Sequence, residues 1–177
     1  MRSKHQAAPV IEFNANADLA LYIAFELSRK KWKLGFSNGR ANRIRIVTIA
    51  AQDWPALRRE IEMARKRFGL AETAAVRSCY EIGREGFWLH RALLQQGIEN
   101  VVVDAASIEV DRRKKRAKTD RMDAEKLTGQ LIRHWRGERA WSMVRVPDAV
   151  DEDARQLHRE MDVLKREKGR YQSRIQS

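Results

Sequence analysis

Apolar and polar residues alternate along the first part of the chain in a pattern that predicts strands before helices. Residues 19–27 form an almost continuous apolar run, which at this length favours a buried strand. Residues 31–36 and 43–49 alternate polar with apolar positions, which predicts two half-buried strands, and residues 37–39 (Ser-Asn-Gly) between them are typical of a hairpin turn. We therefore expect three antiparallel strands in a meander.

Helical spacing begins after the third of these strands. Apolar residues recur at intervals of four and three over residues 57–68, with Asp53 as a candidate N-cap and Gly69 as the stop. The next expected elements are, in order, a short strand over 74–80, a helix over 87–94, a buried strand over 98–103 and a helix that passes through Leu127 and Leu131. This order predicts an α/β fold with a mixed sheet flanked by helices.

A heptad pattern marks the end of the chain. From Val150 to Ile175 the seam residues fall at alternating intervals of four and three, interrupted by Lys168, which favours a self-associating coiled coil. The alternative is an amphipathic helix that packs back on the same domain. Because residues 1–18 are mostly polar or small, the expected organisation is a flexible N-terminal arm (1–18), a domain (19–146) and a coiled-coil helix (147–177).

Composition then narrows the classes of function. The 177 residues include 36 Lys and Arg against 24 Asp and Glu, a net charge of +12 that favours a polyanionic partner such as nucleic acid. The single cysteine, Cys79, excludes an intramolecular disulfide and a cysteine-rich zinc site. No apolar run approaches the roughly 18 residues of a membrane span, and the N-terminus has no apolar signal core. We expect a cytoplasmic protein with no membrane partner.

Acidic residues occupy three positions where composition alone would not place them. Glu26 interrupts the apolar run of the first strand, where an ionised carboxylate is costly unless it is paired or bound to metal. Glu81 ends another strand, and Asp120 and Asp123 share one face at the start of a helix. The four carboxylates together form a hard oxygen ligand set of the kind that suits Mg²⁺ or Mn²⁺.

Each acid also has a purely structural explanation. Glu26 could face outward from an edge strand, and Glu81 could cap the helix that follows it. Asp120 and Asp123 could balance the dipole at the start of their helix. These alternatives stay open at the level of the sequence.

A strongly basic segment leads directly into the aspartate pair. Residues 111–121 carry seven basic and two acidic residues without an apolar pattern, so we expect a loop that contacts phosphates beside the acids rather than a merely solvated one. The expected nucleic-acid contacts are Arg112, Arg113, Lys114, Lys115, Arg116, Lys118 and Arg121. The tryptophans could stack on bases, but we expect Trp32, Trp88, Trp135 and Trp141 to lie in the core because they sit at helix and strand spacings.

The acidic motifs resemble the N-terminal part of the DEDD-type insertion-sequence transposases of the one-ten family, whose first domain is RuvC-like with a ribonuclease-H-like fold. The matching stretches are LYIAFELSRKKW around Glu26, CYEIGREGFWLHR around Glu81 and KTDRMDAEKL around Asp120 and Asp123. The last stretch is the most specific, since a basic residue followed by Thr-Asp-x-x-Asp-Ala is a hallmark of the family. The resemblance covers about residues 20–135.

What the resemblance implies is a bacterial, nucleoid-associated DNA transposase or recombinase guided by a structured RNA. Its catalytic and metal-binding acids would be Glu26, Glu81, Asp120 and Asp123, with Mg²⁺ or Mn²⁺ as cofactor. Its partners would be DNA, the guide RNA and further copies of the chain, joined through residues 150–175. The family usually has Asp where this chain has Glu26, which lengthens the reach of that carboxylate by one methylene.

A second departure concerns the nucleophile. Family members carry a C-terminal domain with a nucleophilic serine, and neither Ser173 nor Ser177 matches that motif. We therefore expect a fragment that binds metal and nucleic acid without completing strand exchange. Two alternatives remain: a non-catalytic module for nucleic-acid binding and oligomerisation, and a stand-alone RuvC-like endonuclease that cuts DNA junctions.

Overall fold

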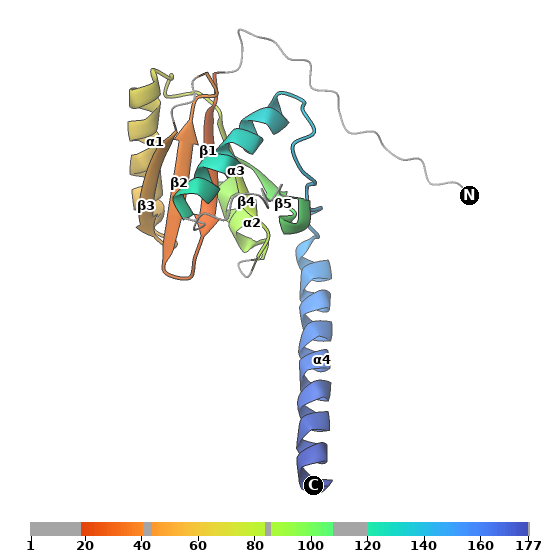
Figure 1. The fold of residues 1–177 in the computed structure, drawn as a ribbon. Coiled ribbons are helices and arrows are strands. Elements are labelled where there is room, and N and C mark those ends of the chain that lie inside the picture. Colours follow the sequence, from red (N-terminus) through yellow and green to blue (C-terminus); the bar gives the residue numbers. More distant parts are fainter. Residues whose placement is uncertain (1–18, 41–43, 84–85, 108–119, 177) are drawn as a thin grey trace, which may run out of the picture. The chain divides into compact units, whose positions relative to one another are not determined.

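A computed structural model describes residues 19–40, 44–83, 86–107 and 120–176, with only the backbone at a few helical positions (Figure 1). The chain divides into two compact units, residues 1–144 and 145–177. Each unit is described by itself. The expected boundary, between residues 146 and 147, falls close to this division, and the expected N-terminal arm lies outside the described residues.

The first unit is built on one five-stranded sheet. Strands β1 and β2, and β2 and β3, pair antiparallel, whereas β4 pairs parallel with both β1 and β5, so the order across the sheet is β3-β2-β1-β4-β5. This is the mixed sheet of a ribonuclease-H-like α/β fold, which confirms the fold class expected from the sequence. The strands are β1 (Leu21–Leu27), β2 (Lys31–Ser37), β3 (Arg45–Ala50), β4 (Val76–Glu81) and β5 (Glu99–Val103).

Helices cover both faces of this sheet. Helices α1 (Trp54–Phe68) and α2 (Trp88–Gln95) lie on one face, and α3 (Asp120–Trp135) crosses the other face over β1 and β2; a short 3₁₀ turn, η1 (Ala105–Ser107), follows β5 (Figure 1). The signals read for α1 are confirmed: Asp53 accepts a hydrogen bond from the Ala56 amide at 2.9 Å, and Gly69 ends the helix in the left-handed conformation at φ 63°.

The two faces of the sheet have different cores. Beneath α3, Tyr22 and Ala24 of β1 pack with Cys79, Leu127 and Leu131. On the opposite face the indole of Trp32, fully buried, contacts Trp54 and Trp88 at ring-centroid distances of 5.6 and 6.3 Å. The expectation of a structural role for the tryptophans is confirmed for Trp32 and Trp141, which are both buried.

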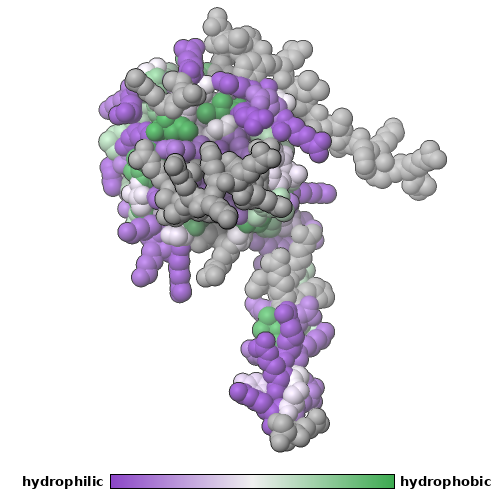
Figure 2. Space-filling view, in the orientation of Figure 1, coloured by the Kyte–Doolittle hydropathy of each residue, from purple (hydrophilic) through white to green (hydrophobic). Residues whose placement is uncertain are grey.

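The second unit contains one long helix, α4 (Ala149–Gln176). Asp148 caps its start, with Oδ1 accepting from the Asp151 amide at 2.7 Å. Large apolar side chains on the expected heptad seam are exposed, among them Leu157 at 61% and Leu164 at 63%. Figure 2 shows that the coloured residues of this helix are mostly hydrophilic. A helix of this kind gains most of its stability by burying such a stripe against a partner.

Candidate functional site

Two of the predicted acids lie at the ends of neighbouring strands. Strands β1 and β4 run parallel, and their last paired residues are Phe25 and Tyr80, so Glu26 and Glu81 come one position later on each strand. Side chains alternate between the faces of a sheet, and the preceding pair on this face, Ala24 and Cys79, belongs to the core beneath α3. Glu26 and Glu81 therefore emerge side by side on the face that α3 covers.

The direction of α3 brings its acidic start to the same end of the sheet. Near the middle of the helix, Thr128 Oγ1 donates to the Gly35 carbonyl at 3.3 Å, and toward its end Arg136 donates to the Gly39 carbonyl. Gly35 pairs with Ala24 on β1, whereas Gly39 lies past the opposite end of that strand, beside Tyr22. The helix thus runs antiparallel to β1, and its first residues, Asp120 and Asp123, lie toward the Glu26 end (Figure 1).

The alternative explanations for the two glutamates are wrong. β1 is the central strand, so Glu26 does not face outward from an edge, and it is only partly exposed. Helix α2 has Phe87 at its N-cap position, so Glu81 does not cap that helix; its side chain is exposed. Asp123 is half-buried, and the side chain of Asp120 lies outside the described residues.

The described carboxylates do not form a preassembled metal site. Among the side chains that the structure describes, no group of three or more His, Cys, Asp or Glu residues is placed to hold a metal ion. Glu26, Glu81 and Asp123 therefore share an end and a face of the sheet without closing on one point. This statement does not apply to a metal site that includes Asp120, because the side chain of Asp120 lies outside the described residues. The donor atoms themselves are hard carboxylate oxygens, which is the chemistry that Mg²⁺ and Mn²⁺ require.

The predicted basic contacts lie outside what the structure describes. Residues 112–118 fall in the gap before α3, and only the backbone of Arg121 is described, in the first turn of that helix. Their role stays a prediction.

Sequence reasoning missed a second group of polar residues next to Glu26. A depression at this end of the sheet is lined by Glu26, Leu27, Ser28, Lys31, Lys33 and Thr48. Glu26 pairs with Lys33, and Lys33 pairs with Thr48, so these three side chains form one row across β1, β2 and β3 on the α3 face. The run of three cations directly after the first acidic strand, at residues 29–31, is the signal that could have revealed it.

His90 and Cys79 have structural surroundings. Ser78 Oγ donates to Asn100 Oδ1 at 2.8 Å, and Asn100 Nδ2 lies 2.9 Å from His90 Nδ1, which holds that ring nitrogen as an acceptor. Desolvation, with a smaller contribution from the Arg91 charge, lowers the pKa of His90. Burial raises the pKa of the Cys79 thiol, so this cysteine stays protonated and is a poor nucleophile.

The fold defines the class of domain. The mixed five-stranded sheet with helices on both faces is that of a ribonuclease-H-like domain, and carboxylates lie at the ends of β1 and β4 and near the start of the helix across them. The chain is 40% identical, over 162 residues, to a protein of Sinorhizobium fredii (strain NBRC 101917 / NGR234) named "Putative transposase y4rJ". The match includes 88% of this chain and 40% of that relative.

The chain is a homologue of a protein named as a transposase and spans about 40% of its length. No family model matches the chain, and no solved structure matches it. Among the described residues, no helix is long and apolar enough to cross a membrane.

Proposed function

We propose that this chain supplies the metal-dependent catalytic domain of a DNA transposase or recombinase. Glu26, Glu81, Asp120 and Asp123 would bind Mg²⁺ or Mn²⁺ and act on DNA phosphodiesters. The observation that carries the proposal is the placement of Glu26 and Glu81 at adjacent parallel strand ends, beneath a helix whose first turn carries the two aspartates. Similarity to a protein named as a transposase supports the same reading.

The roles of the residues follow from how each is held. Divalent ions bound by such carboxylates activate a water or hydroxyl and stabilise the leaving oxygen of a phosphodiester. Glu26 enters from the central strand, between Phe25, which is 1% exposed, and the partly buried Leu27, so strands pair with its own strand on both sides. Glu81 stands on an exposed strand end and has room to adjust. Asp123 depends on the position of α3, which the hydrogen bond from Thr128 Oγ1 to the Gly35 carbonyl ties to the sheet.

Metal binding is the first test of the proposal. Mn²⁺ titrated into the wild-type chain should release heat that saturates and should raise the melting temperature. Asp123→Asn and Glu81→Gln keep the side-chain shapes while removing charge, so both should weaken the response at least tenfold. Glu62→Gln is the matched control, because Glu62 is an exposed acid of α1 on the opposite face. Equal responses in all four proteins would contradict the proposal.

Strand cleavage is the second test. Wild-type protein should nick supercoiled DNA in Mn²⁺, and Asp123→Asn should abolish nicking while leaving DNA binding intact. We further propose that a structured RNA guides the whole protein, a role supported by the +12 charge and by the sequence resemblance. Sequencing of RNA bound to the protein in cells would test that role, and recovery of no enriched RNA would count against it.

A non-catalytic module for nucleic-acid binding and oligomerisation is the second candidate. The absence of a preassembled group of three acidic ligands among the described residues favours it. In that case DNA would bind equally well with and without metal, and Asp123→Asn would change neither binding nor melting. The calorimetric titration described above separates the two candidates.

Self-association through α4 belongs to either candidate. Leu157 and Leu164 lie on the heptad seam and are exposed, as expected for residues that a second copy would cover. Sedimentation should show an oligomer for the wild type and a monomer for Leu157→Asp/Leu164→Asp. Val163→Asp is the control, because Val163 is exposed at 48% on the same helix but lies off the seam. An unchanged oligomer in the double variant would exclude this interface.

A further inference from the structure

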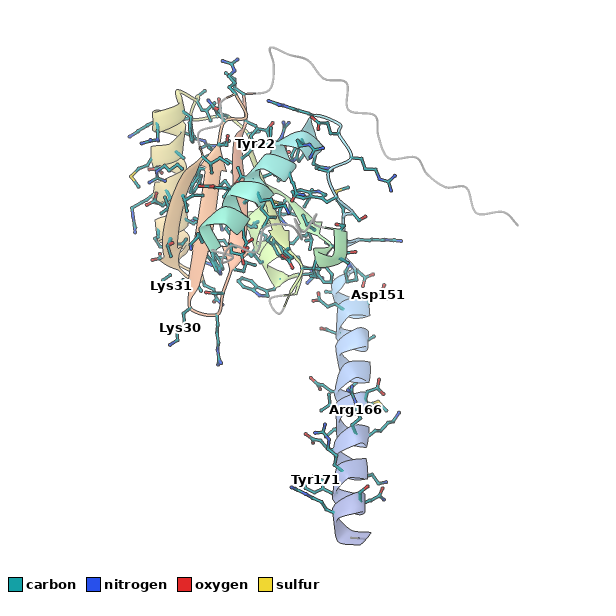
Figure 3. All side chains as sticks on the ribbon, in the orientation of Figure 1. Tyr22, Lys30, Lys31, Asp151, Arg166 and Tyr171 are labelled. Atoms are coloured by element: carbon teal, nitrogen blue, oxygen red, sulfur yellow. The ribbon has the colours of Figure 1, made fainter. Side chains whose placement is uncertain are left out.

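The turn between β1 and β2 holds three consecutive cations, close to the end of β1 where Glu26 lies. Arg29, Lys30 and Lys31 are all exposed, and they follow the strand that ends with Glu26 and Leu27. Figure 3 shows Lys30 and Lys31 at the tip of this hairpin. Three positive charges at one tight turn repel one another, so their placement has no benefit for the folding of the hairpin itself.

Hydrogen bonds make the turn rigid. Ser28 Oγ donates to the Lys31 carbonyl at 2.7 Å and accepts from the Lys31 amide at 3.2 Å, and the Ser28 amide also donates to the Lys31 carbonyl at 3.0 Å. The Ala51 amide donates to the Lys30 carbonyl at 3.0 Å, which joins the turn to the end of β3. The backbone that carries the cations is therefore held in one place, so less backbone entropy is lost when they bind a ligand.

These cations differ from the arginines at the other end of the sheet. There, Arg77 pairs with Glu99 at 3.3 Å and lies 4.3 Å from the Trp135 ring centroid, and Arg133 pairs with Glu138 at 2.7 Å. In the part of the chain that the structure describes, the side chains of residues 29–31 have no ion-pair partner. Their charge is available to an external anion.

We propose that this hairpin binds the phosphodiester backbone of the DNA strand on which the acidic residues act. The contacts come from Lys30 and Lys31 at the tip and from Lys33 and Thr48 in the depression beside Glu26. This inference rests on the proposed function for the identity of the strand. The binding site itself is independent of metal chemistry.

The distance between Lys31 and Lys33 favours a DNA strand over a single anion as the ligand. Lys31 and Lys33 are two residues apart on one face of β2, which separates them by about 6.6 Å. Successive phosphates of one B-DNA strand rise by about 3.4 Å along the helix axis, so the distance between the two lysines corresponds to about two phosphate steps. The row Glu26–Lys33–Thr48 places an acid next to a cation and a hydroxyl. A strand that follows the cations would thus bring its next phosphodiester to the carboxylates.

Site-directed crosslinking tests the contact directly. Cys79 is fully buried and protonated, so a cysteine introduced on the surface is the main reactive thiol of the chain. Lys31→Cys, carrying a photoactivatable crosslinker and incubated with a labelled DNA duplex in EDTA, should crosslink at least fivefold more than Arg67→Cys. Arg67 lies in the last turn of α1, roughly 20 Å along the helix from the hairpin end. Equal yields, or a higher yield with an RNA of the same sequence, would overturn the proposal.

Salt dependence provides a second readout that does not require labelling. The DNA-binding constant falls as salt rises, and each lost phosphate contact makes the slope of log K against log salt shallower by about 0.9. Lys30→Gln/Lys31→Gln should therefore make this slope shallower by about 1.8. Lys66→Gln/Arg67→Gln removes the same charge from the far end of α1 and should change it little. Identical slopes in the two variants would exclude the hairpin contact.

The two proposals fail in different ways. If Lys31→Cys crosslinks as expected but no metal-dependent nicking occurs, the hairpin binds DNA and the catalytic proposal is wrong. If the wild type nicks DNA in Mn²⁺ but the Lys31 and Arg67 probes crosslink equally, the hairpin inference is wrong and the catalytic proposal stands.

Discussion

Gly35 is the point at which α3 rests on the sheet, and replacing it with alanine tests how the acidic site is assembled. A Cβ at Gly35 would lie 3.0 Å from the Ala124 carbonyl and would collide with Thr128 Oγ1. Both atoms belong to fully buried residues of the helix that carries Asp123. Overpacking of a well-packed core costs about 1–3 kcal/mol, so we expect Gly35→Ala to lower the free energy of unfolding by that amount.

A matched substitution on the helix itself should have the opposite sign. Gly129 lies inside α3, and a Cβ there would meet nothing within 4 Å. Because glycine in a helix interior is less stable than alanine by about 0.5–1 kcal/mol, Gly129→Ala should raise the free energy of unfolding. Urea titrations of the two variants, followed by far-ultraviolet circular dichroism, measure both changes. A neutral or stabilising Gly35→Ala would refute the close approach of helix and strand.

The same substitution should disturb the site through the position of the helix. A collision relieved by an outward shift of about 1 Å would displace Asp123, and a shift of that size can cost about 100-fold in rate. Removing one of the two clashing atoms in Gly35→Ala/Thr128→Ala should recover part of the lost stability. We expect Mn²⁺ affinity to fall in Gly35→Ala, whereas Gly129→Ala should bind metal as the wild type does. If Gly35→Ala lowers the free energy of unfolding but binds Mn²⁺ as tightly as the wild type does, the metal site does not depend on the contact between α3 and Gly35.

Three further predictions concern the stability of the domain. Burial lowers the pKa of His90 and of His134, so the unfolded chain binds more protons near pH 6; the free energy of unfolding should be highest above about pH 6.5 and fall as the pH drops, and His90→Gln/His134→Gln should flatten this dependence in urea titrations. Asp53→Ala removes the acceptor for the Ala56 amide and should cost about 1 kcal/mol in the same assay. Cys79 should react with a thiol reagent only after denaturant is added, and rapid reaction of the native protein would contradict its burial.

Local patterns were sufficient to predict most of the secondary structure. Alternation predicted β2 because Trp32, Leu34 and Phe36 are buried at every second position, and the capping signals of α1 depend only on neighbouring residues. Alternation also predicted a strand at β3, although Ile49 is the only residue that β3 buries. The expected mixed sheet follows from the element order, because a helix between two strands allows them to run parallel. These features are decided within a few residues of the chain, where sequence patterns are strongest.

The candidate site could be predicted only in part, since it depends on contacts between distant segments. That β1 is central, and that Glu26 therefore lies inside the sheet, is decided by β4 pairing beside it some 50 residues later. The path of α3 is decided by Gly35, whose missing side chain admits Thr128. The residue sequence contains these glycines and acids but does not say which of them meet.

The charge pattern at this end of the domain links the two proposals physically. Carboxylates alone would repel a DNA strand, and at 4 Å in water two like charges interact with about 1 kcal/mol. The hairpin cations Arg29, Lys30 and Lys31 follow Glu26 by three to five residues along the chain, and β2, which begins at Lys31, pairs with the strand that carries Glu26. The groups proposed to attract DNA and to bind metal therefore lie on one pair of strands. Replacing the cations should therefore weaken DNA binding most where metal is absent, because bound metal neutralises the carboxylates. If the effect of Lys30→Gln/Lys31→Gln is equal with and without Mn²⁺, the cations and the acids act on separate parts of the DNA.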